Sequence, residues 1–228
     1  MAGTLILATH GVAGGPGVAV EHARRIRGRG RWAQVRVGCL KASPSLAEAM
    51  ADAPEPVTVV PLLMSGGVIH QVLRHRLSEI APDRRWRLTS PVGESPKLAR
   101  LVRVRAGAWC HRLGWSHSDT SLLLIGHGTS RHAASANHAA AVADALQGCG
   151  FGAVGYALLE EPPLPAEAIA MMPGGHVVAV GLFLDNGPHG DTDVRQALAG
   201  TARDVAYVGA IGAERALVGL IVAQAMAI

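Results

Sequence analysis

The chain has 228 residues, 49% of them hydrophobic and only 4% aromatic, and its formal net charge at pH 7 is +4. The apolar content suffices for a sizeable core, whereas so few aromatic side chains argue against a base-stacking surface, and we expect no nucleic-acid partner. Arginine clusters at 24–31, 84–87 and 100–105 fit either solvated helix faces or a surface for an acidic partner such as phosphate or a polycarboxylate.

The cysteines and the apolar runs indicate the cellular compartment in which we expect the protein. Cys39, Cys110 and Cys149 are far apart and form no C-x-x-C motif, so they predict neither a disulfide framework nor a zinc or iron–sulfur cluster site. The first ten residues lack the features of a signal peptide, and no run reaches the roughly 18 apolar residues of a membrane span. We therefore expect a soluble cytoplasmic protein without a membrane partner, either a monomer or a homodimer.

Apolar runs alternate with helical patterns along the chain. In the first half, strands are expected at 5–8, 32–40, 57–64 and 86–92, and helices at 16–29, 44–51, 69–80 and 95–113. In the second half, strands are expected at 121–126, 152–159, 177–184 and 205–208, and helices at 133–146, 166–172, 192–198 and 214–227. This alternation predicts an α/β fold with parallel sheets flanked by helices. The polar segment 114–120 divides it into two similar Rossmann-like lobes, 1–117 and 118–228, with a cleft between them.

Histidines follow apolar runs at corresponding places in both halves. His10 and His127 each precede a glycine directly after the first run, and His70 and His189 follow the third run about 60 residues later. Ligands bind at the carboxyl ends of parallel strands, so all four histidines are candidate catalytic residues at strand ends. A single histidine at such a place could equally be a packed or capping residue, but the repetition favours a functional role.

The middle of the repeat differs between the halves in charge. Aligning the two proline-containing turns places Lys41 on Glu160. In the second lobe, His127, Glu160 and His189 would offer two imidazoles and a carboxylate, an open site for a borderline divalent metal such as Co, Fe, Ni or Zn. The imidazoles could also accept protons. Because Lys41 would repel a cation in the first lobe, the predicted metal site is in the second.

A glycine-rich segment at 11–17 opens a helical pattern and could hold a phosphate on its backbone amides. It has neither the G-x-G-x-x-G fingerprint nor the P-loop lysine, so nucleotide binding is a weaker alternative, and we expect no organic cofactor. The other histidines are expected to be surface or capping residues; they are His22, His75, His111, His117, His132, His138 and His176.

The ordered set of motifs resembles a known family, the class II tetrapyrrole chelatases, and within it the sirohydrochlorin cobaltochelatases and ferrochelatases in their long, two-repeat form. The motifs that carry the resemblance run through the whole chain: Thr9-His10-Gly11, Gly126-His127-Gly128, Leu159-Glu160 with Pro163 following, Pro61 to His70, Gly181 to His189, and Pro91-Val92-Gly93. None of these motifs is specific alone, but their repeated order is.

The resemblance implies that the chain inserts Co²⁺ or Fe²⁺, or Ni²⁺, into the acidic tetrapyrrole sirohydrochlorin, in cobalamin or sirohaem biosynthesis. It also implies that two histidines and a glutamate bind this substrate metal and help to remove the pyrrole protons. The working site usually lies in the first repeat of the long sirohydrochlorin enzymes and in the second repeat of other class II chelatases. Here Lys41 replaces the acid of the first repeat, and Thr9 replaces its usual glycine.

A second function is compatible with the same residues. A non-enzymatic carrier of metal or tetrapyrrole on this fold would keep the histidines but would not need their proton-transfer geometry. The ligand types do not distinguish Co²⁺, Fe²⁺ and Ni²⁺ from one another.

Overall fold

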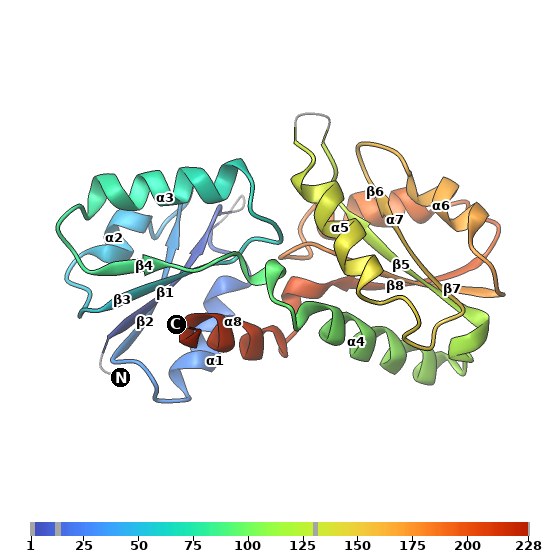
Figure 1. Cartoon of the computed structure of the whole chain (residues 1–228), viewed down its shortest axis with the longest axis horizontal. Coiled ribbons are helices and arrows are strands. Elements are labelled where there is room, and N and C mark those ends of the chain that lie inside the picture. Colours follow the sequence, from blue (N-terminus) through green and yellow to red (C-terminus); the bar gives the residue numbers. More distant parts are fainter. Residues whose placement is uncertain (1–2, 12–14, 130–131, 228) are drawn as a thin grey trace. The chain divides into compact units, whose positions relative to one another are not determined.

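The computed structural model describes residues 3–11, 15–129 and 132–227. They form two four-stranded parallel sheets with strand orders β2-β1-β3-β4 and β6-β5-β7-β8 (Figure 1). The strands are β1 (Thr4–Thr9), β2 (Gln34–Cys39), β3 (Val57–Pro61), β4 (Trp86–Leu88), β5 (Thr120–Gly126), β6 (Ala153–Leu158), β7 (His176–Gly181) and β8 (Asp204–Ala210). The helices are α1 (Ala19–Arg27), α2 (Leu46–Met50), α3 (Val68–Ile80), α4 (Leu98–Leu113), α5 (Ala134–Asp144), α6 (Pro165–Met171), α7 (Val194–Leu198) and α8 (Leu217–Met226). The predicted α/β fold of two similar lobes is confirmed.

The first strand of each repeat lies inside its sheet and is covered on both faces. β1 pairs with β2 and β3, and β5 pairs with β6 and β7. The apolar side chains at 5–8 and 122–125 are fully buried, as expected for strands with helices on both sides. No helix within the described ranges is both long and apolar enough to cross a membrane.

The backbone confirms the alignment of the two repeats around the charge difference. The amide of Lys41 donates a hydrogen bond to the carbonyl of His10 at 3.0 Å. The amide of Glu160 donates to the carbonyl of His127 at the same distance, 3.0 Å. Lys41 and Glu160 therefore occupy equivalent positions, each tied to the end of the central strand of its sheet.

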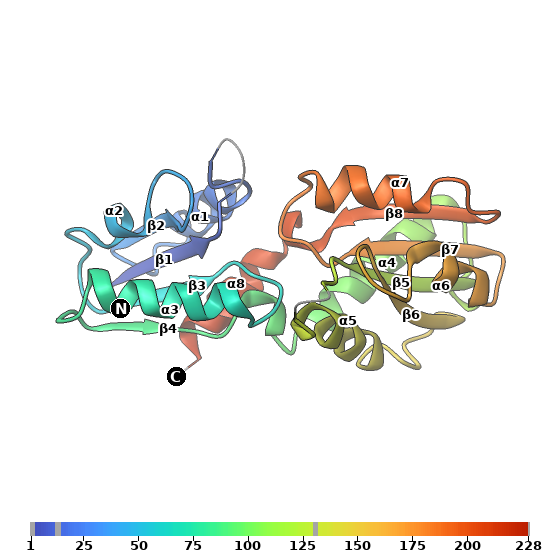
Figure 2. The same ribbon diagram turned by 90° about the horizontal axis from the view of Figure 1, so that it is seen from above.

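The two compact units differ from the expected division at 117 and 118. One unit comprises residues 1–95 together with 215–228, and the other comprises residues 96–214. The helix that ends the first repeat, α4, packs against β7 and β8, whereas the helix that ends the second repeat, α8, packs against β3 and α1 (Figures 1 and 2). The closing helices are thus exchanged between the repeats. The expected cleft between the lobes stays a prediction.

The buried apolar stripes of α4 and α8 explain why each helix packs on a sheet. They do not explain which of the two sheets each helix covers. The buried stripe of α4 consists of Leu98, Val102, Ala106 and Cys110, and that of α8 of Leu217, Val218, Leu220, Ile221, Val222 and Ala225. Both repeats offer a sheet face built from the same aliphatic residues, so the apolar pattern alone does not assign either helix to a sheet. In the first unit Arg87 stabilises the observed packing, because its guanidinium donates to the carbonyls of Ala225 and Ala227 at the end of α8.

The exchange of helices makes a testable prediction about Ile221, which is fully buried in α8. Replacing it with alanine should destabilise the first unit by about 2–5 kcal/mol, the usual cost of removing a buried isoleucine side chain. In hydrogen exchange measured by mass spectrometry, Ile221→Ala should speed exchange in peptides from β3 and α1. Val102→Ala in α4 is the reciprocal control and should affect β7 and β8. If Ile221→Ala sped hydrogen exchange only in β5 to β8, or Val102→Ala only in β1 to β4, the assignment of the two helices to opposite repeats would be wrong.

Candidate functional site

A tight turn places His127 at the carboxyl edge of the second sheet. β5 ends one residue before His127, and Gly128 has a φ of +74°. Side chains are disfavoured in that conformation, and a Cβ at position 128 would also lie 2.9 Å from the Cβ of Leu158. Gly11, with a φ of +89°, makes the same turn after His10. The His-Gly pairs in the sequence therefore mark sharp exits from the two central strands.

The two adjacent glutamates have different roles in this turn. Glu161 accepts a hydrogen bond from the amide of Thr129 at 2.8 Å and so holds the loop that follows His127. Glu160 faces His127 itself, with its Oε1 atom 3.5 Å from the imidazole Nδ1. At this distance the two groups form an ion pair when the imidazole is protonated, but not a well-formed hydrogen bond. Nδ1 is buried, and within the described residues it has no hydrogen-bond partner.

His189 does not directly end a strand, contrary to the sequence expectation. β7 ends at Gly181, and a loop carries the chain to a π-helical turn, η3 (His189–Asp193), which continues into α7. The Asp193 amide donates to the carbonyl of Pro188 at 2.9 Å, a bond that spans five residues as in a π-helix. This turn places Oδ2 of Asp193 2.7 Å from Nδ1 of His189.

Tyr207 on β8 holds η3 in place through a hydrogen bond to its backbone. Its hydroxyl donates a hydrogen bond to the carbonyl of Gly190, and its ring is 8% exposed. Burial raises the pKa of Tyr207, with a further contribution from the nearby charge of Asp191, so the hydroxyl keeps the proton that it donates. Arg195 lies 5.5 Å above the tyrosine ring and pairs with Asp191 at 2.7 Å. These contacts hold the backbone of η3 between α7 and β8.

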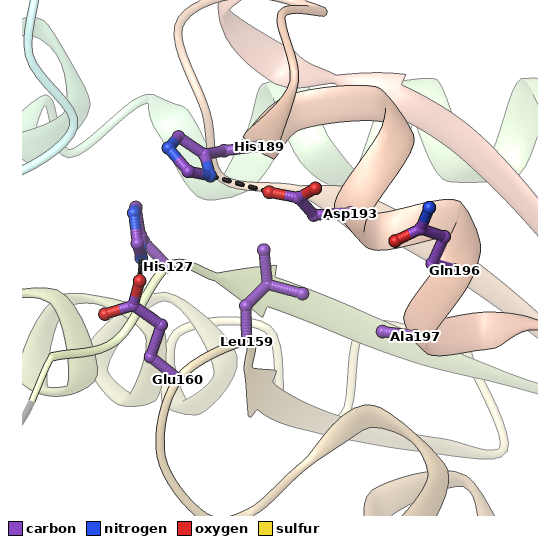
Figure 3. Close-up of a pocket in the computed structure, with 7 residues that line it drawn as sticks. All are labelled: His127, Leu159, Glu160, His189, Asp193, Gln196 and Ala197. Atoms are coloured by element: carbon purple, nitrogen blue, oxygen red, sulfur yellow. Dashed lines mark hydrogen bonds and ion pairs between the residues drawn. The ribbon is translucent and has the colours of Figure 1, made fainter.

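These elements form a pocket of about 340 Å³ in the second lobe (Figure 3). It is lined by His127, Leu159, Glu160, His189, Asp193, Gln196 and Ala197. The rings of His127 and His189 lie 4.5 Å apart between centroids and are tilted by 45°. The volume is near the lower end of the roughly 300–1,000 Å³ of small-molecule sites. It suffices for a metal ion or for one edge of a larger substrate.

The three predicted metal ligands line this pocket, but they are not arranged as a finished metal site. Among residues 3–11, 15–129 and 132–227, no three His, Cys, Asp or Glu side chains are positioned to hold a metal ion. Each imidazole is paired with a carboxylate instead, His127 with Glu160 and His189 with Asp193. Imidazole and carboxylate donors suit a borderline divalent metal. The side chains of His127, Glu160 and His189 are 37%, 53% and 59% exposed, so all three are open to solvent.

The first lobe arranges its two histidines differently. Nδ1 of His10 lies 3.2 Å from the carbonyl of Gly11, and Nε2 of His70 lies 3.2 Å from the carbonyl of Thr89. In the part of the chain that the structure describes, only the second lobe shows a ring contact between its two predicted histidines. The exposed Lys41 stands at the position of Glu160. The structure thus brings the predicted residues together in the second lobe.

The sequence alignment of His70 with His189 is out of register by one residue. The amides four residues after Gly67 and Gly187 donate to the carbonyls of those glycines at 3.2 and 2.9 Å. Matching these two turns aligns His70 with Gly190. A shift of one residue rotates a side chain by about 100° around a helix. The expectation that the second histidine occupies the same place in each repeat, at a strand end, is therefore wrong.

Sequence reasoning missed four pocket residues: Leu159, Asp193, Gln196 and Ala197. A signal for Asp193 was present, because it follows His189 by four residues, the spacing of neighbours on a helix face. The helical pattern was expected to begin only at 192, after His189, so the pair was not recognised. The π-helical turn that extends α7 back to His189 left no pattern of its own in the sequence.

Several other expectations meet a mixed outcome. His22 was expected on the surface or as a cap, but it is only 1% exposed within α1. His176 is largely buried and stacks on Trp115, with ring centroids 4.3 Å apart. The glycine-rich segment 11–17 includes residues 12–14, which lie outside the described residues, so the nucleotide alternative stays a prediction.

Many of the clustered arginines make structural contacts. Arg84 donates to the carbonyls of Met50 and Ala53 after α2, and Arg203 donates to the carbonyls of Met172 and Gly174 at the corresponding place after α6. Arg24 and Arg25 pair with Glu21, whose pKa falls to about 2, mainly through its hydrogen bond with Arg24. Arg105 pairs with Glu214 at 2.6 Å. For these arginines, the contacts favour a structural role over an acidic partner.

Comparisons with known proteins match both repeats. The CbiX family model covers residues 4–108 and 121–227, and the chain therefore belongs to the CbiX family. This confirms the family that the sequence motifs indicated. No protein with a curated description matches the sequence.

Solved structures share the fold. DR2241 of Deinococcus radiodurans, described as multi-domain and structurally similar to chelatases, has a TM-score of 0.81 and 24% identity over 97% of this chain, which spans 54% of that protein. CbiX, described as the terminal enzyme of siroheme biosynthesis in denitrifying bacteria, has a TM-score of 0.78 and 23% identity over 97% of both chains. SirB from Bacillus subtilis, solved with Fe³⁺, has a TM-score of 0.76 and 17% identity over 98% of this chain and 94% of SirB.

The turn at Gly128 allows a matched pair of substitutions. Gly128→Ala should cost about 1–3 kcal/mol of stability from backbone strain, and the clash with Leu158 should displace His127. Gly148 has a similar φ of +69°, and an added Cβ there would meet nothing within 4 Å, so Gly148→Ala is the control for strain alone. Unfolding by denaturant measures the loss of stability, and calorimetric titration measures the affinity for Co²⁺. Weaker Co²⁺ binding is expected for Gly128→Ala only; equal losses in both variants would show that the turn does not position His127.

Proposed function

We propose that this chain is a sirohydrochlorin chelatase that inserts a divalent metal, cobalt or iron, into the tetrapyrrole. One observation carries the proposal: His127, Glu160 and His189, from three segments that follow three different strands of the second sheet, line a single pocket. Membership of the CbiX family supports the reaction class. The acidic tetrapyrrole is the proposed substrate and the metal ion is the second substrate.

The paired imidazoles and carboxylates suit both parts of this reaction. Insertion removes two N–H protons from the tetrapyrrole while the metal exchanges water for ring nitrogens, so a base must stand close to the point of metal delivery. His127 and His189 face each other across 4.5 Å and can serve as proton acceptors there. Glu160 supplies a negative charge beside His127, which stabilises either a bound cation or a protonated ring. Exposed donors bind a metal loosely, and loose binding favours its transfer.

Cobalt and iron are the proposed metals. Structures of SirB proteins contain Fe³⁺ in one case and cobalt in another. Imidazole and carboxylate ligands accept Co²⁺, Fe²⁺ and Ni²⁺ alike, so geometry and supply decide among them. We assign the chemistry to the second lobe because Lys41 places a cation at the equivalent position of the first.

The first test of this function is the insertion reaction itself. The purified chain should accelerate the change in the absorption spectrum when sirohydrochlorin is mixed with Co²⁺ or Fe²⁺. Glu160→Gln keeps the shape but removes the charge, so it should weaken metal binding by at least the roughly 10-fold loss seen for outer-shell partners. Glu167→Gln, at an exposed position on α6, is the matched control. If the chain binds metal yet leaves the insertion rate unchanged, it acts as a carrier and the proposed activity is wrong.

The second test concerns the lobe that carries the chemistry. His127→Ala and His189→Ala should each lower the insertion rate about 100-fold or more, as expected for the loss of a proton acceptor or metal ligand. His10→Ala and His70→Ala should have much smaller effects, because these histidines contact backbone carbonyls in the first lobe. Circular dichroism checks that all four variants fold. Loss of activity in the first-lobe pair alone would assign the reaction to the first repeat.

A further inference from the structure

We propose that Asp193 is a positioning residue that fixes His189 as the Nδ1–H tautomer and thereby leaves Nε2 as the ring nitrogen with a free lone pair. The importance of this tautomer for catalysis rests on the proposed function, but the tautomer itself does not. Oδ2 of Asp193 lies 2.7 Å from Nδ1 of His189, the distance of a strong hydrogen bond (Figure 3).

The chemistry of the two groups decides which atom carries the proton. An ionised carboxylate only accepts hydrogen bonds, so the nitrogen that faces it must be the donor. A neutral imidazole has one N–H and one lone pair, so a proton on Nδ1 leaves the lone pair on Nε2. Nε2 lies on the side of the ring away from Asp193 (Figure 3). Nε2 is therefore the atom of His189 that is able to accept a proton or bind a metal.

The backbone around this pair is anchored independently of it. Tyr207 binds the carbonyl of Gly190, and Arg195 binds Asp191, so η3 is held by contacts that do not involve His189. A Cβ at Gly190 would meet the carbonyl oxygen of Asp185 at 1.9 Å, which shows how closely the turn packs on the preceding loop. Asp193 is consequently brought to Nδ1 by a fixed scaffold. It orients the ring rather than following it.

Asp193 and Glu160 thus have different relations to their histidines. Glu160 stands 3.5 Å from Nδ1 of His127 without a well-formed hydrogen bond, so it is available to turn toward a cation. Asp193 is engaged at 2.7 Å and belongs to the same helical turn as its partner. The two carboxylates of the pocket are therefore not interchangeable. Glu160 is the proposed metal ligand, whereas Asp193 fixes the tautomer and the orientation of the His189 imidazole.

The proposal is tested by nuclear magnetic resonance on the full chain labelled with ¹⁵N-histidine, at a pH where imidazole is neutral. The signal of His189 is assigned by its loss in His189→Gln. The wild-type protein should show a protonated Nδ1 and an unprotonated Nε2. Asp193→Ala should shift both nitrogens toward the averaged values of a tautomer mixture. Asp144→Ala, which removes an exposed carboxylate at the end of α5 in the same lobe and away from His189, should keep the wild-type pattern.

Kinetics supplies the second measurement. Asp193→Ala should lower kcat for metal insertion about 10–100-fold, the usual effect of losing an outer-shell partner, with a smaller change in KM for the metal. Asp144→Ala should leave kcat nearly unchanged. A protonated Nε2 in the wild-type protein, or an unchanged His189 signal in Asp193→Ala, would overturn the proposal. If the wild-type protein inserts no metal, the proposed function fails, and the resonance pattern still decides the role of Asp193.

Discussion

The hydrogen bond from the amide of Glu160 to the carbonyl of His127 joins the ends of two neighbouring strands, and the candidate site depends on it. It brings the carboxylate and the imidazole to one edge of the sheet through the backbone alone, before any side chain makes a contact. The same bond joins Lys41 to His10 in the first lobe. Because the backbone is equivalent in both places, the two lobes differ at this position by the charge of one side chain.

The sequence predicts the parts of the fold that follow from local chemistry. Runs such as 122–125 are apolar on both faces because β5 is covered on both sides, and the length of the run locates the strand. The glycine at 128 is required by a positive φ next to β6, so His-Gly marks a true exit from the sheet. The charge difference between Lys41 and Glu160 was visible because the repeat could be aligned around a turn.

Other features depend on choices that leave no mark in the local pattern. The stripe of α4 fits either of two aliphatic sheets, so its assignment to β7 and β8 could not be read from periodicity. His189 lies two residues after Gly187, whereas His70 lies three residues after Gly67, and the π-helical turn that begins at His189 has no sequence pattern of its own. As a result the role of Asp193 was missed, although its spacing from His189 is that of a helix neighbour. His127, Glu160 and His189 were predicted from the sequence, whereas Asp193 and its pairing with His189 were not.

The exchanged helices have a consequence for how the protein is made. The second unit is a continuous stretch, 96–214, whereas the first unit needs both 1–95 and 215–228. On the ribosome, domains fold as their residues emerge. The sheet of β1 to β4 emerges first but must wait for α8 to cover it, while the sheet of β5 to β8 already has α4 when its last strand appears. The half of the protein that is synthesised second is therefore the half that completes its fold first, and a released chain that ended at residue 214 would hold the whole second unit with its pocket and a first sheet that lacks α8.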